Sequence, residues 1–426
     1  MSSDWQLVKL SALGTFDRGK SKHRPRDAKH LYGGAYPFIQ TGDITSAGGR
    51  IISYRQTYSE AGLAQSKLWP SKTLCITIAA NIAETALLTF PACFPDSVVG
   101  FTVDPQKADV RFVEYLFRAF RDSVKRRAYG SAQENINLEV LRDLAFPVPG
   151  LQEQIIIADF LTLFDDRISL LRENNATLEA IAQALFKSWF VDFDPVRAKA
   201  EGLEPEGMDA ATTALFPDSF EESGIGLVPR GWKCSTVGQS FILTMGQSPP
   251  GDTYNESGEG LSFYQGRTDF GFRFPTQRIF CSAPTRLAEA GDTLVSVRAP
   301  VGDVNIALEP CALGRGVASV RHPHGHQSFV FYSVRSLKTH FELYDGEGTV
   351  FGSINKKDFQ ALPVFLPGES LLEAFEGLVA PLDAGIENNE RRLRALTQLR
   401  DTLLPRLISG QLRLPEAEAM VEEVDA

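Results

Sequence analysis

The sequence contains two long helical stretches that repeat each other at a constant offset. This offset aligns Leu151, the start of the first stretch, with Glu369, the start of the second. In the first stretch, Leu151 to Phe193, apolar residues recur at alternating steps of four and three, which is the pattern of a heptad seam. The seam positions are Phe164, Ile168, Leu171, Asn175, Leu178, Ala182, Leu185 and Trp189, and their equivalents are Leu382, Ile386, Asn389, Leu393, Leu396, Arg400, Leu403 and Leu407. A heptad seam is typical of a helix that packs lengthwise against another helix. The chain is therefore expected to consist of two copies of one unit.

The repeat extends upstream of both helical stretches. Residues 130–150 (GSAQENINLEVLRDLAFPVPG) align with residues 348–368 (GTVFGSINKKDFQALPVFLPG), with identical residues at six aligned positions. Near the start of each copy, Trp5 aligns with Trp232, and the segment FIQTGD from Phe38 corresponds to FYQGRTD from Phe263. Each copy is thus a diverged globular part followed by a similar long helix.

Punctuation by proline and glycine, together with local charge, divides the chain into six segments. The predicted segments are a globular domain at 1–150, a long helix at 151–194, a partly ordered acidic connector at 195–230, a second globular domain at 231–368, a second long helix at 369–412 and a frayed acidic tail at 413–426. Pro405 is expected to kink or stop the second helix about one turn before Ser409.

The predicted fold class is α+β, with two α/β domains separated by a pair of long antiparallel helices. Each helix alone would leave its apolar seam unburied, so we expect the two to form an intramolecular coiled coil. A helix of about 40 residues is roughly 60 Å long and can act as a spacer. Asn175 and Asn389 interrupt the seams. They either select the register of the pair or lie at exposed edges of the apolar faces.

The net charge of −10 is unevenly distributed. Residues 200–224 and 414–426 hold twelve acids and no base, and removing those acids leaves 43 bases against 41 acids. Basic residues cluster at 18–30 and at 118–127. Such clusters are either solvated faces or contacts for nucleic acid, so the charge map permits a DNA partner without establishing one.

Five scattered cysteines, Cys75, Cys93, Cys234, Cys281 and Cys311, form no CxxC pair. They are expected to be reduced thiols, with neither a disulfide framework nor a zinc site. The sequence has no run of 18 apolar residues and no signal-peptide h-region at its start. A cytoplasmic protein is the expected class.

Sequence signatures of catalysis are missing. There is no GxxxxGK[ST] motif for ATP and no Asn/Asp-Pro-Pro-aromatic tetrapeptide for amino methylation, since the one Pro-Pro pair lies in SPPG at 248–251. The segment GEGTVFG at 346–352 has the wrong spacing for a dinucleotide fingerprint and is expected to be a flexible turn. His322, His324 and His326 alternate in a Pro/Gly segment and are expected on the surface without a metal.

Four segments resemble those of a known family, the specificity subunits of type I restriction-modification systems. They are QALFKSWFVDFDPVRAK (183–199), LRDTLLPRLISGQLRL (399–414), the Pro-Gly junction before the first helix at Pro147 and its repeat at Pro367. The resemblance covers the whole chain in the order target-recognition domain, spacer helix, target-recognition domain, spacer helix. It implies a non-catalytic reader of double-stranded DNA that binds no cofactor itself.

The same resemblance implies how such a reader works. Each target-recognition domain reads one half of a bipartite, gapped site in the major groove, and the helix pair sets the gap and docks two methyltransferase subunits. Those partners use S-adenosylmethionine to methylate adenine N6, and restriction/translocase subunits using ATP and Mg²⁺ join for cleavage. Half-sites on one face of B-DNA lie about 34 Å apart, which is compatible with the expected spacer.

Side chains able to contact bases or phosphates indicate where DNA binds. In the first domain the candidates are Lys20, Ser21, Lys22, Arg24, Gln40, Thr41, Arg126, Arg127, Gln133 and Asn135. In the second domain they are Gln247, Ser248, Gln265, Arg267, Thr268, Arg298, Arg315, Lys356 and Lys357. Asn137 and Asn355 also repeat, but each begins a helical stretch, so helix capping is the favoured role.

Two other functions remain open at this stage. One is a scaffold whose two globular domains bind protein or polysaccharide, and the other is an enzyme with an unrecognised site, such as a nuclease. DNA affinity that falls linearly with log[salt] distinguishes a DNA reader from the scaffold. Turnover of DNA by the isolated chain in Mg²⁺ would indicate the enzyme.

Overall fold

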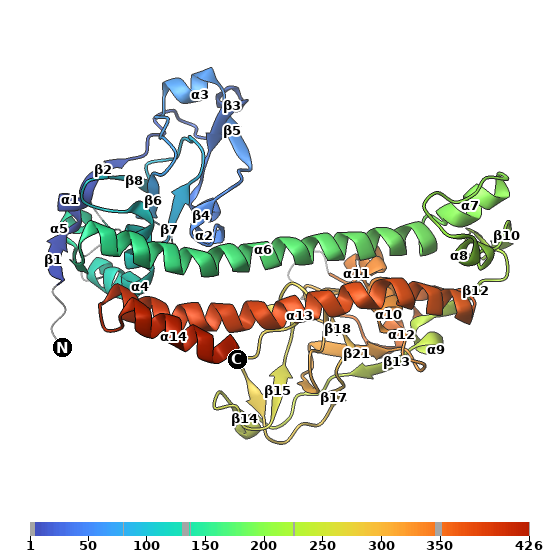
Figure 1. The fold of residues 1–426 in the computed structure, drawn as a ribbon. Helices are drawn as coiled ribbons and strands as arrows, with labels where there is room; N and C mark the ends of the chain where they lie inside the picture. The colour runs from blue at the N-terminus through green and yellow to red at the C-terminus, as the bar shows by residue number, and fades with distance from the viewer. Residues whose placement is uncertain are drawn as a thin grey trace. The chain divides into compact units, whose positions relative to one another are not determined.

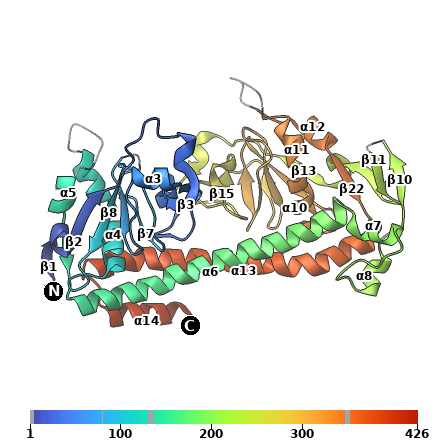
Figure 2. The ribbon, with the colours of Figure 1, turned by 90° about the horizontal axis from the view of Figure 1, so that it is seen from above.

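The computed structural model describes residues 5–79, 81–129, 136, 138–224, 226–345 and 352–425. The chain divides into two compact units. The first unit comprises residues 1–169 and 394–426, and the second comprises residues 170–393. Each unit therefore contains one globular domain together with a part of each long helix (Figures 1 and 2).

The first unit is built on a five-stranded sheet with strand order β2-β8-β6-β7-β4. Neighbouring strands are antiparallel except β4 and β7, which are parallel. The strands of the unit are β1 (Gln6–Lys9), β2 (Gly14–Arg18), β3 (Tyr32–Phe38), β4 (Arg50–Ile51), β5 (Gln56–Tyr58), β6 (Leu74–Thr77), β7 (Thr85–Leu88), β8 (Val98–Val103) and β9 (Ala145–Val148). Two further antiparallel pairs, β1 with β9 and β3 with β5, complete the domain.

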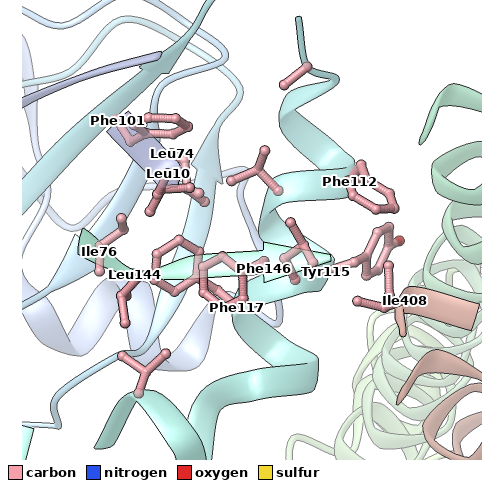
Figure 3. Close-up of a cluster of buried hydrophobic side chains, with 14 of the residues drawn as sticks. Leu10, Leu74, Ile76, Phe101, Phe112, Tyr115, Phe117, Leu144, Phe146 and Ile408 are labelled. Carbon is pink, nitrogen blue, oxygen red and sulfur yellow. The ribbon is translucent and has the colours of Figure 1, made fainter. Parts of the chain in front are cut away.

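Helix α4 (Val110–Tyr129) fills the core of the first unit, as Figure 3 shows. Its residues Phe112, Leu116 and Phe117 are fully buried, and they belong to one cluster with Ile76 of β6 and Ile408 of the second long helix. A separate apolar cluster includes Cys75 and Leu88, so the central strands are buried on both faces. The short helices are α1 (Leu10–Leu13), α2 (Thr41–Ser46), α3 (Glu60–Ala64) and α5 (Leu138–Asp143).

The second unit contains a four-stranded antiparallel sheet, β13-β21-β18-β19, and a five-stranded sheet, β14-β16-β15-β20-β17. The strands are β12 (Lys233–Thr236), β13 (Ile242–Met245), β14 (Tyr254–Asn255), β15 (Leu261–Tyr264), β16 (Phe280–Cys281), β17 (Leu287–Ala288), β18 (Thr293–Ser296), β19 (Val304–Ile306), β20 (Cys311–Leu313), β21 (Val317–Arg321) and β22 (Pro363–Leu366). Its shorter helices are α9 (Val237–Ser240), α10 (Gln327–Ser336), α11 (Lys338–Glu342) and α12 (Lys356–Ala361). Strand β12 pairs with β22, as β1 pairs with β9 in the first unit.

The long helices α6 (Leu151–Phe190) and α13 (Glu369–Ile408) both contain 40 residues, and their first and last residues are related by the offset of the sequence repeat. They are antiparallel partners within each unit. In the first unit Arg400 Nη1 donates to Asp165 Oδ1 at 2.7 Å, and in the second Asn389 Nδ2 donates to Asn175 Oδ1 at 2.9 Å. The predicted α+β class with an antiparallel intramolecular helix pair is confirmed.

The sixteen predicted seam positions are withdrawn from solvent. Ten are buried, namely Phe164, Ile168, Leu171, Asn175, Ala182, Trp189, Ile386, Leu393, Leu403 and Leu407. Six are half-buried, namely Leu178, Leu185, Leu382, Asn389, Leu396 and Arg400. Because Asn175 is only 1% exposed, the reading that places it at an exposed edge is wrong.

The ends of the long helices differ from the sequence prediction. Helix α6 ends at Phe190. Phe193 adopts a left-handed conformation (φ 57°), which breaks the helical path before Pro195. Helix α13 does not stop before Pro405 but continues to Ile408. Pro405 is exposed, whereas Leu404 and Ile408 are buried, so packing of the last turn outweighs the hydrogen bond that the proline loses.

The acidic tail is not frayed. Residues Leu414–Asp425 form helix α14, which packs against the core of the first unit through fully buried Ala417 and partly buried Met420. Proline in its first turn and a hydrogen bond from Arg413 N to Glu416 Oε2 (3.0 Å) favour this helix start. Apolar residues at helical spacing therefore outweigh the acidic composition.

The acidic connector is ordered in the part of it that the structure describes. It contains α7 (Asp194–Ala200), α8 (Ala210–Ala214) and the antiparallel strands β10 (Phe220–Ser223) and β11 (Gly226–Pro229). Phe216 is buried against Trp189 of α6, with ring centroids 5.1 Å apart. The aromatic contact explains why an acidic segment folds onto the second unit. In the described part of the chain, no helix has the length and apolarity needed to cross a membrane.

Candidate nucleic-acid interface

The first group of candidate residues follows strand β2. Gly19 N donates to Val98 O and Lys20 N donates to Phe94 O, so the segment after the strand is fixed to the sheet. A Cβ at Gly19 would lie 2.3 Å from Pro95 O, so a glycine is needed for this close approach. Lys20 and Lys22 are exposed, whereas Ser21 is buried. The segment therefore presents cations, which suit phosphate, more readily than the serine hydroxyl.

Two other candidates of the first unit carry internal hydrogen bonds. Arg24 Nη1 donates to Ser21 O at 2.6 Å and to His23 O at 2.9 Å, which holds this exposed guanidinium against its own backbone. Gln40 precedes α2, and its Nε2 donates to Gln56 Oε1 at 2.6 Å. Thr41, the first residue of α2, is half-buried. A base contact by Gln40 would require the Gln56 bond to open.

The basic cluster on α4 is largely neutralised within the first unit. Arg121 and Lys125 both pair with Glu84, at 3.1 and 3.3 Å, and Arg118 pairs with Glu114. Arg126 is exposed at the end of the helix. The side chain of Arg127 lies outside the described residues, as do Gln133 and Asn135.

Three loops of the second unit meet where strands β13, β15 and β20 end. Gln247 N donates to Leu313 O at 3.0 Å, and Gly314 N donates to Tyr264 O at 2.8 Å. A Cβ at Gly246 would lie 2.2 Å from Gly314 O, and a Cβ at Gly316 would lie 2.2 Å from Gln265 O. Glycines at these two positions thus allow three backbones to converge.

This convergence, which we call the three-loop junction (residues 246–248, 264–266 and 313–316), groups four predicted residues. Gln247, Gln265 and Arg315 are exposed there. Ser248 Oγ accepts hydrogen bonds from Arg315 N (3.4 Å) and Nε (3.2 Å), which orients the guanidinium. Two amides and one guanidinium are the groups that form bidentate bonds with adenine and guanine.

The remaining candidates of the second unit lie in two further places. Arg267 pairs with Asp303 at 2.9 Å beside exposed Thr268, so its charge is compensated. Arg298 forms an isolated β-bridge with Ser353. Ser353 lies three residues before Lys356, and both Lys356 and Lys357 of α12 are exposed. Asn355 Oδ1 accepts from Asp358 N at 3.0 Å, which is the predicted N-cap. Its repeat equivalent, Asn137, and most of the predicted turn at 346–352 lie outside the described residues.

The histidines are placed differently from the prediction. His322 and His326 are buried, and only His324 is exposed. His322 Nδ1 accepts from His324 N at 3.1 Å, and His326 Nε2 lies 2.8 Å from Glu369 Oε1. Burial and the neighbouring His326 lower the pKa of His322 to about 4. Within the described residues, no group of three or more potential ligands could hold a metal ion.

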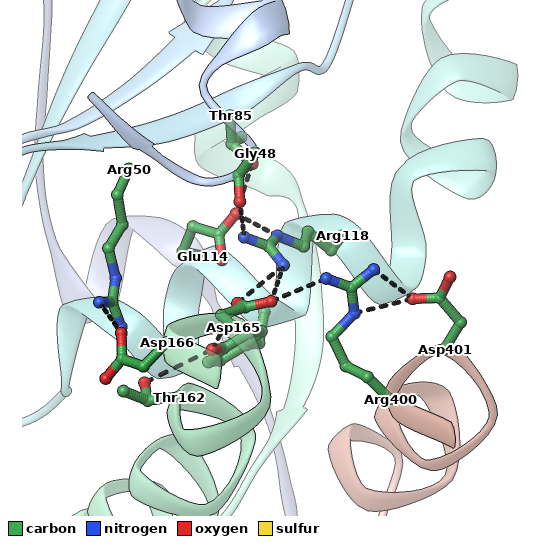
Figure 4. A network of polar contacts seen from close by, with 11 residues as sticks. Gly48, Arg50, Thr85, Glu114, Arg118, Thr162, Asp165, Asp166, Arg400 and Asp401 are labelled. Atoms are coloured by element: carbon green, nitrogen blue, oxygen red, sulfur yellow. Dashed lines mark hydrogen bonds and ion pairs between the residues drawn. The ribbon is translucent and has the colours of Figure 1, made fainter. Parts of the chain in front are cut away.

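An anchoring network in the first unit was missed by sequence reasoning (Figure 4). Asp165 of α6 accepts hydrogen bonds from Tyr115 Oη (2.8 Å), Arg118 Nη1 (3.0 Å) and Arg400 Nη1 (2.7 Å). Burial raises the pKa of Glu114, against the opposing effect of Arg118. Burial alone would lower the pKa of Arg118, but Glu114 and Asp165 raise it, so the guanidinium stays charged. The network ties the globular domain to both long helices.

The second unit contains an equivalent network. Tyr332 Oη lies 3.4 Å from Asp383 Oδ1 of α13, and the fully buried Arg273 donates to both residues at 2.7 Å. Arg335 pairs with Glu179 of α6. A sequence signal exists for this repeat.

That signal is the motif Phe-Val-x-Tyr-x-x-Arg. It occurs at 112–118 and again at 329–335, and Asp165 and Asp383 are related by the same offset as the two long helices. Both tyrosines reach the long helix that follows their own domain.

Comparisons with known proteins agree in the family they indicate. Residues 2–180 match the family described as type I restriction modification DNA specificity domain. A Methanocaldococcus jannaschii protein named as the type I restriction enzyme MjaX specificity subunit is 30% identical over 318 residues, covering 72% of this chain and 69% of the relative. The Haemophilus influenzae HindI specificity subunit is 28% identical, covering 73% of this chain and 80% of the relative.

A solved structure shows the same fold. The crystal structure of the type I restriction-modification S subunit from M. genitalium aligns with a TM-score of 0.59 at 17% identity, covering 95% of this chain and 96% of that chain. These relatives are named for a specificity subunit, which agrees with the expectation of a non-catalytic role.

Proposed function

Because the chain belongs to the family of type I restriction-modification DNA specificity subunits, we propose that each globular domain reads one half of a bipartite, gapped DNA site. The three-loop junction carries this proposal. It brings together Gln247, Gln265 and Arg315 on three loops that glycines and backbone hydrogen bonds hold close to one another. Amide and guanidinium side chains of this kind form bidentate contacts with the edges of DNA bases. The first unit offers the corresponding segment after β2, whose exposed Lys20 and Lys22 fit phosphates.

The long helices are the proposed spacer that sets the gap. Helix α6 contains 40 residues, which corresponds to about 60 Å at 1.5 Å per residue. Each globular domain is tied to this pair by a buried network rather than by a linker alone. A domain held in this way reads its half-site at a defined place along the helices.

The exposed side of α6 is the proposed docking surface for two methyltransferase subunits. In the first unit Ile156 and Leu163 are 42% and 67% exposed. In the second unit Leu170 and Ile181 are 47% and 46% exposed. Large apolar residues on an outer helix face are typical of protein contacts. The docked subunits would bring S-adenosylmethionine for adenine N6 methylation, and restriction/translocase subunits would bring ATP and Mg²⁺ chemistry for cleavage, in the cytoplasm.

The salt dependence of DNA binding tests this function. The chain, assembled with its methyltransferase partner, should bind duplex DNA with an affinity that falls linearly with log[salt]. An assembled complex that shows no salt-dependent DNA binding would favour the scaffold for protein or polysaccharide. Catalytic turnover of DNA by the chain alone in Mg²⁺ would instead indicate a nuclease.

A further inference from the structure

A buried polar layer interrupts the seam between α6 and α13 in the second unit. Asn389 Nδ2 donates to Asn175 Oδ1 at 2.9 Å, and Asn175 Nδ2 donates to Glu390 Oε1 at 2.9 Å. Asn175 is 1% exposed, so its amide depends on these partners. Trp189 and Phe375, with ring centroids 5.9 Å apart, lie in the same register two heptads away. This register also places Leu171 opposite Leu393, both of which are buried.

The internal repeat makes a competing pairing possible. Because α6 and α13 repeat each other position by position along their whole length, each helix could also pair with the same helix of a second copy of the chain. In such a like-with-like pair of the same geometry, Asn175 takes the partner position that corresponds to Asn389, which is Leu171. Asn389 likewise faces Leu393 of the second copy.

The two arrangements differ in how they match these four positions. Pairing α6 with α13 gives one amide–amide layer and one leucine–leucine layer. Like-with-like pairing of two chains gives only mixed layers, each with a buried amide against a leucine. A buried amide without a hydrogen-bonding partner is costly, whereas leucine against leucine is favourable. We infer that Asn175 and Asn389 select the pairing of α6 with α13 over the pairing of like helices from two copies.

The buried ion pair between Arg400 and Asp165 does not make this choice. Arg400 binds Asp165 in the first unit, but Asp383, the repeat equivalent of Asp165, would offer Arg400 a carboxylate in a like-with-like pair. The number of ion pairs that Arg400 forms over two chains is therefore the same in both arrangements. The pair between Arg413 and Glu153 has no such equivalent, because Leu371 corresponds to Glu153, but its side chains are 47% and 41% exposed and it contributes little. Selection depends on the asparagine layer, as in coiled coils where one buried amide fixes partner and register.

The consequence concerns which domains share one helix pair. Pairing of α6 with α13 joins two different globular domains, whereas like-with-like pairing would join two identical ones. The asparagine layer thus keeps the two readers of one chain together. This pairing choice does not depend on DNA binding and can be tested without DNA.

The test uses the full chain with a disulfide reporter at the neighbouring layer. Leu171→Cys and Leu393→Cys, with exposed Cys234→Ser, should form an intrachain disulfide when α6 pairs with α13. In this background N175L/N389L makes both layers apolar in either arrangement. N174L is the matched control, because it adds the same leucine at an exposed neighbouring position. Light scattering and non-reducing electrophoresis report chain mass and disulfide pattern.

The wild-type layer and N174L should give monomers with the intrachain disulfide at every concentration. N175L/N389L should raise the dimer association constant by about tenfold or more, and its dimers should lack the reporter disulfide. L171N/L393N is examined without the cysteine reporter and carries asparagine at all four positions. An amide then faces an amide in either arrangement, so this variant should also dimerise. A fully cross-linked, monomeric N175L/N389L would overturn the inference, as would dimers joined by an interchain 171–393 disulfide.

Discussion

Arg400 of α13 donates to Asp165 of α6 at 2.7 Å, although 235 residues separate the two in sequence. Tyr115 and Arg118 of the first globular domain bind the same carboxylate. One aspartate therefore joins three elements of the first unit. Its repeat equivalent, Asp383, joins Tyr332 and Arg273 in the second unit.

Removing Arg400 should destabilise the first unit. The side chain is 17% exposed, so R400A leaves the buried carboxylate with fewer partners, and a loss of about 3 kcal/mol is expected. R391A is the control, because Arg391 is 56% exposed and forms an i,i+4 pair with Glu387 worth about 0.5 kcal/mol or less. Denaturant unfolding of both variants measures the difference. Equal stability of the two variants would contradict the buried role of Arg400.

The tyrosines of the repeated motif should differ in their effect. Y115F removes a 2.8 Å hydrogen bond to a buried carboxylate and should cost about 1–2 kcal/mol. Tyr332 lies 3.4 Å from Asp383, but its Oη also accepts a 2.7 Å hydrogen bond from the fully buried Arg273, so Y332F should cost at least as much as Y115F. Thermal unfolding of the two single variants tests this order. A clearly smaller cost for Y332F than for Y115F would contradict this order.

Stability of the second unit should depend on the protonation of His322. Its pKa in the folded chain is about 4, below the ordinary value of 6.5, so the unfolded chain binds the proton more readily between these values. The contribution is complete above pH 6.5 and is lost as the pH falls toward 4. H322N should therefore flatten the decline of thermal stability between pH 6.5 and 5, whereas H324N at the exposed neighbour should not. An unchanged pH profile in H322N would assign the decline to other groups.

Residues that bind phosphate and residues that read bases should affect DNA binding differently. The first should change its salt dependence, and the second its dependence on DNA sequence. K22A should weaken binding of the assembled complex to all sequences and lower the salt slope by about one. R315A should weaken the binding free energy for the native site by about 1–3 kcal/mol and reduce the base preference at one position of that site. The loss of affinity for other sequences should be smaller. K107A, an exposed lysine before α4, is the control for charge alone. A uniform loss of affinity in R315A would place Arg315 on phosphate instead.

The helix pair could be predicted because its signal is periodic and local. A heptad seam that recurs at a constant offset is enough to give two antiparallel helices of equal length. The tail was misjudged because composition was weighed above spacing. Ala417 and Met420 lie at helical spacing, and their burial against the first unit decides the outcome.

The candidate interface was predicted only in part. Residue type indicated Gln247, Gln265 and Arg315, and the fold groups them because glycines allow three loops to converge. Residue type could not show that Ser21 is buried, nor that Arg121 pairs with Glu84, since both depend on strand and helix neighbours distant in sequence. The Phe-Val-x-Tyr-x-x-Arg motif was available in the sequence and would have indicated both anchoring networks.

The most direct measurement is single-molecule methylation sequencing of DNA from cells that express the chain with its methyltransferase partner. The proposed function predicts N6-methyladenine at one gapped, two-part motif, and replacing residues 1–150 with the domain of a relative should change one half of that motif. A chain that is expressed with its partner and yields no methylated motif would contradict DNA reading. A domain replacement that alters both halves would contradict the assignment of one half-site to each domain.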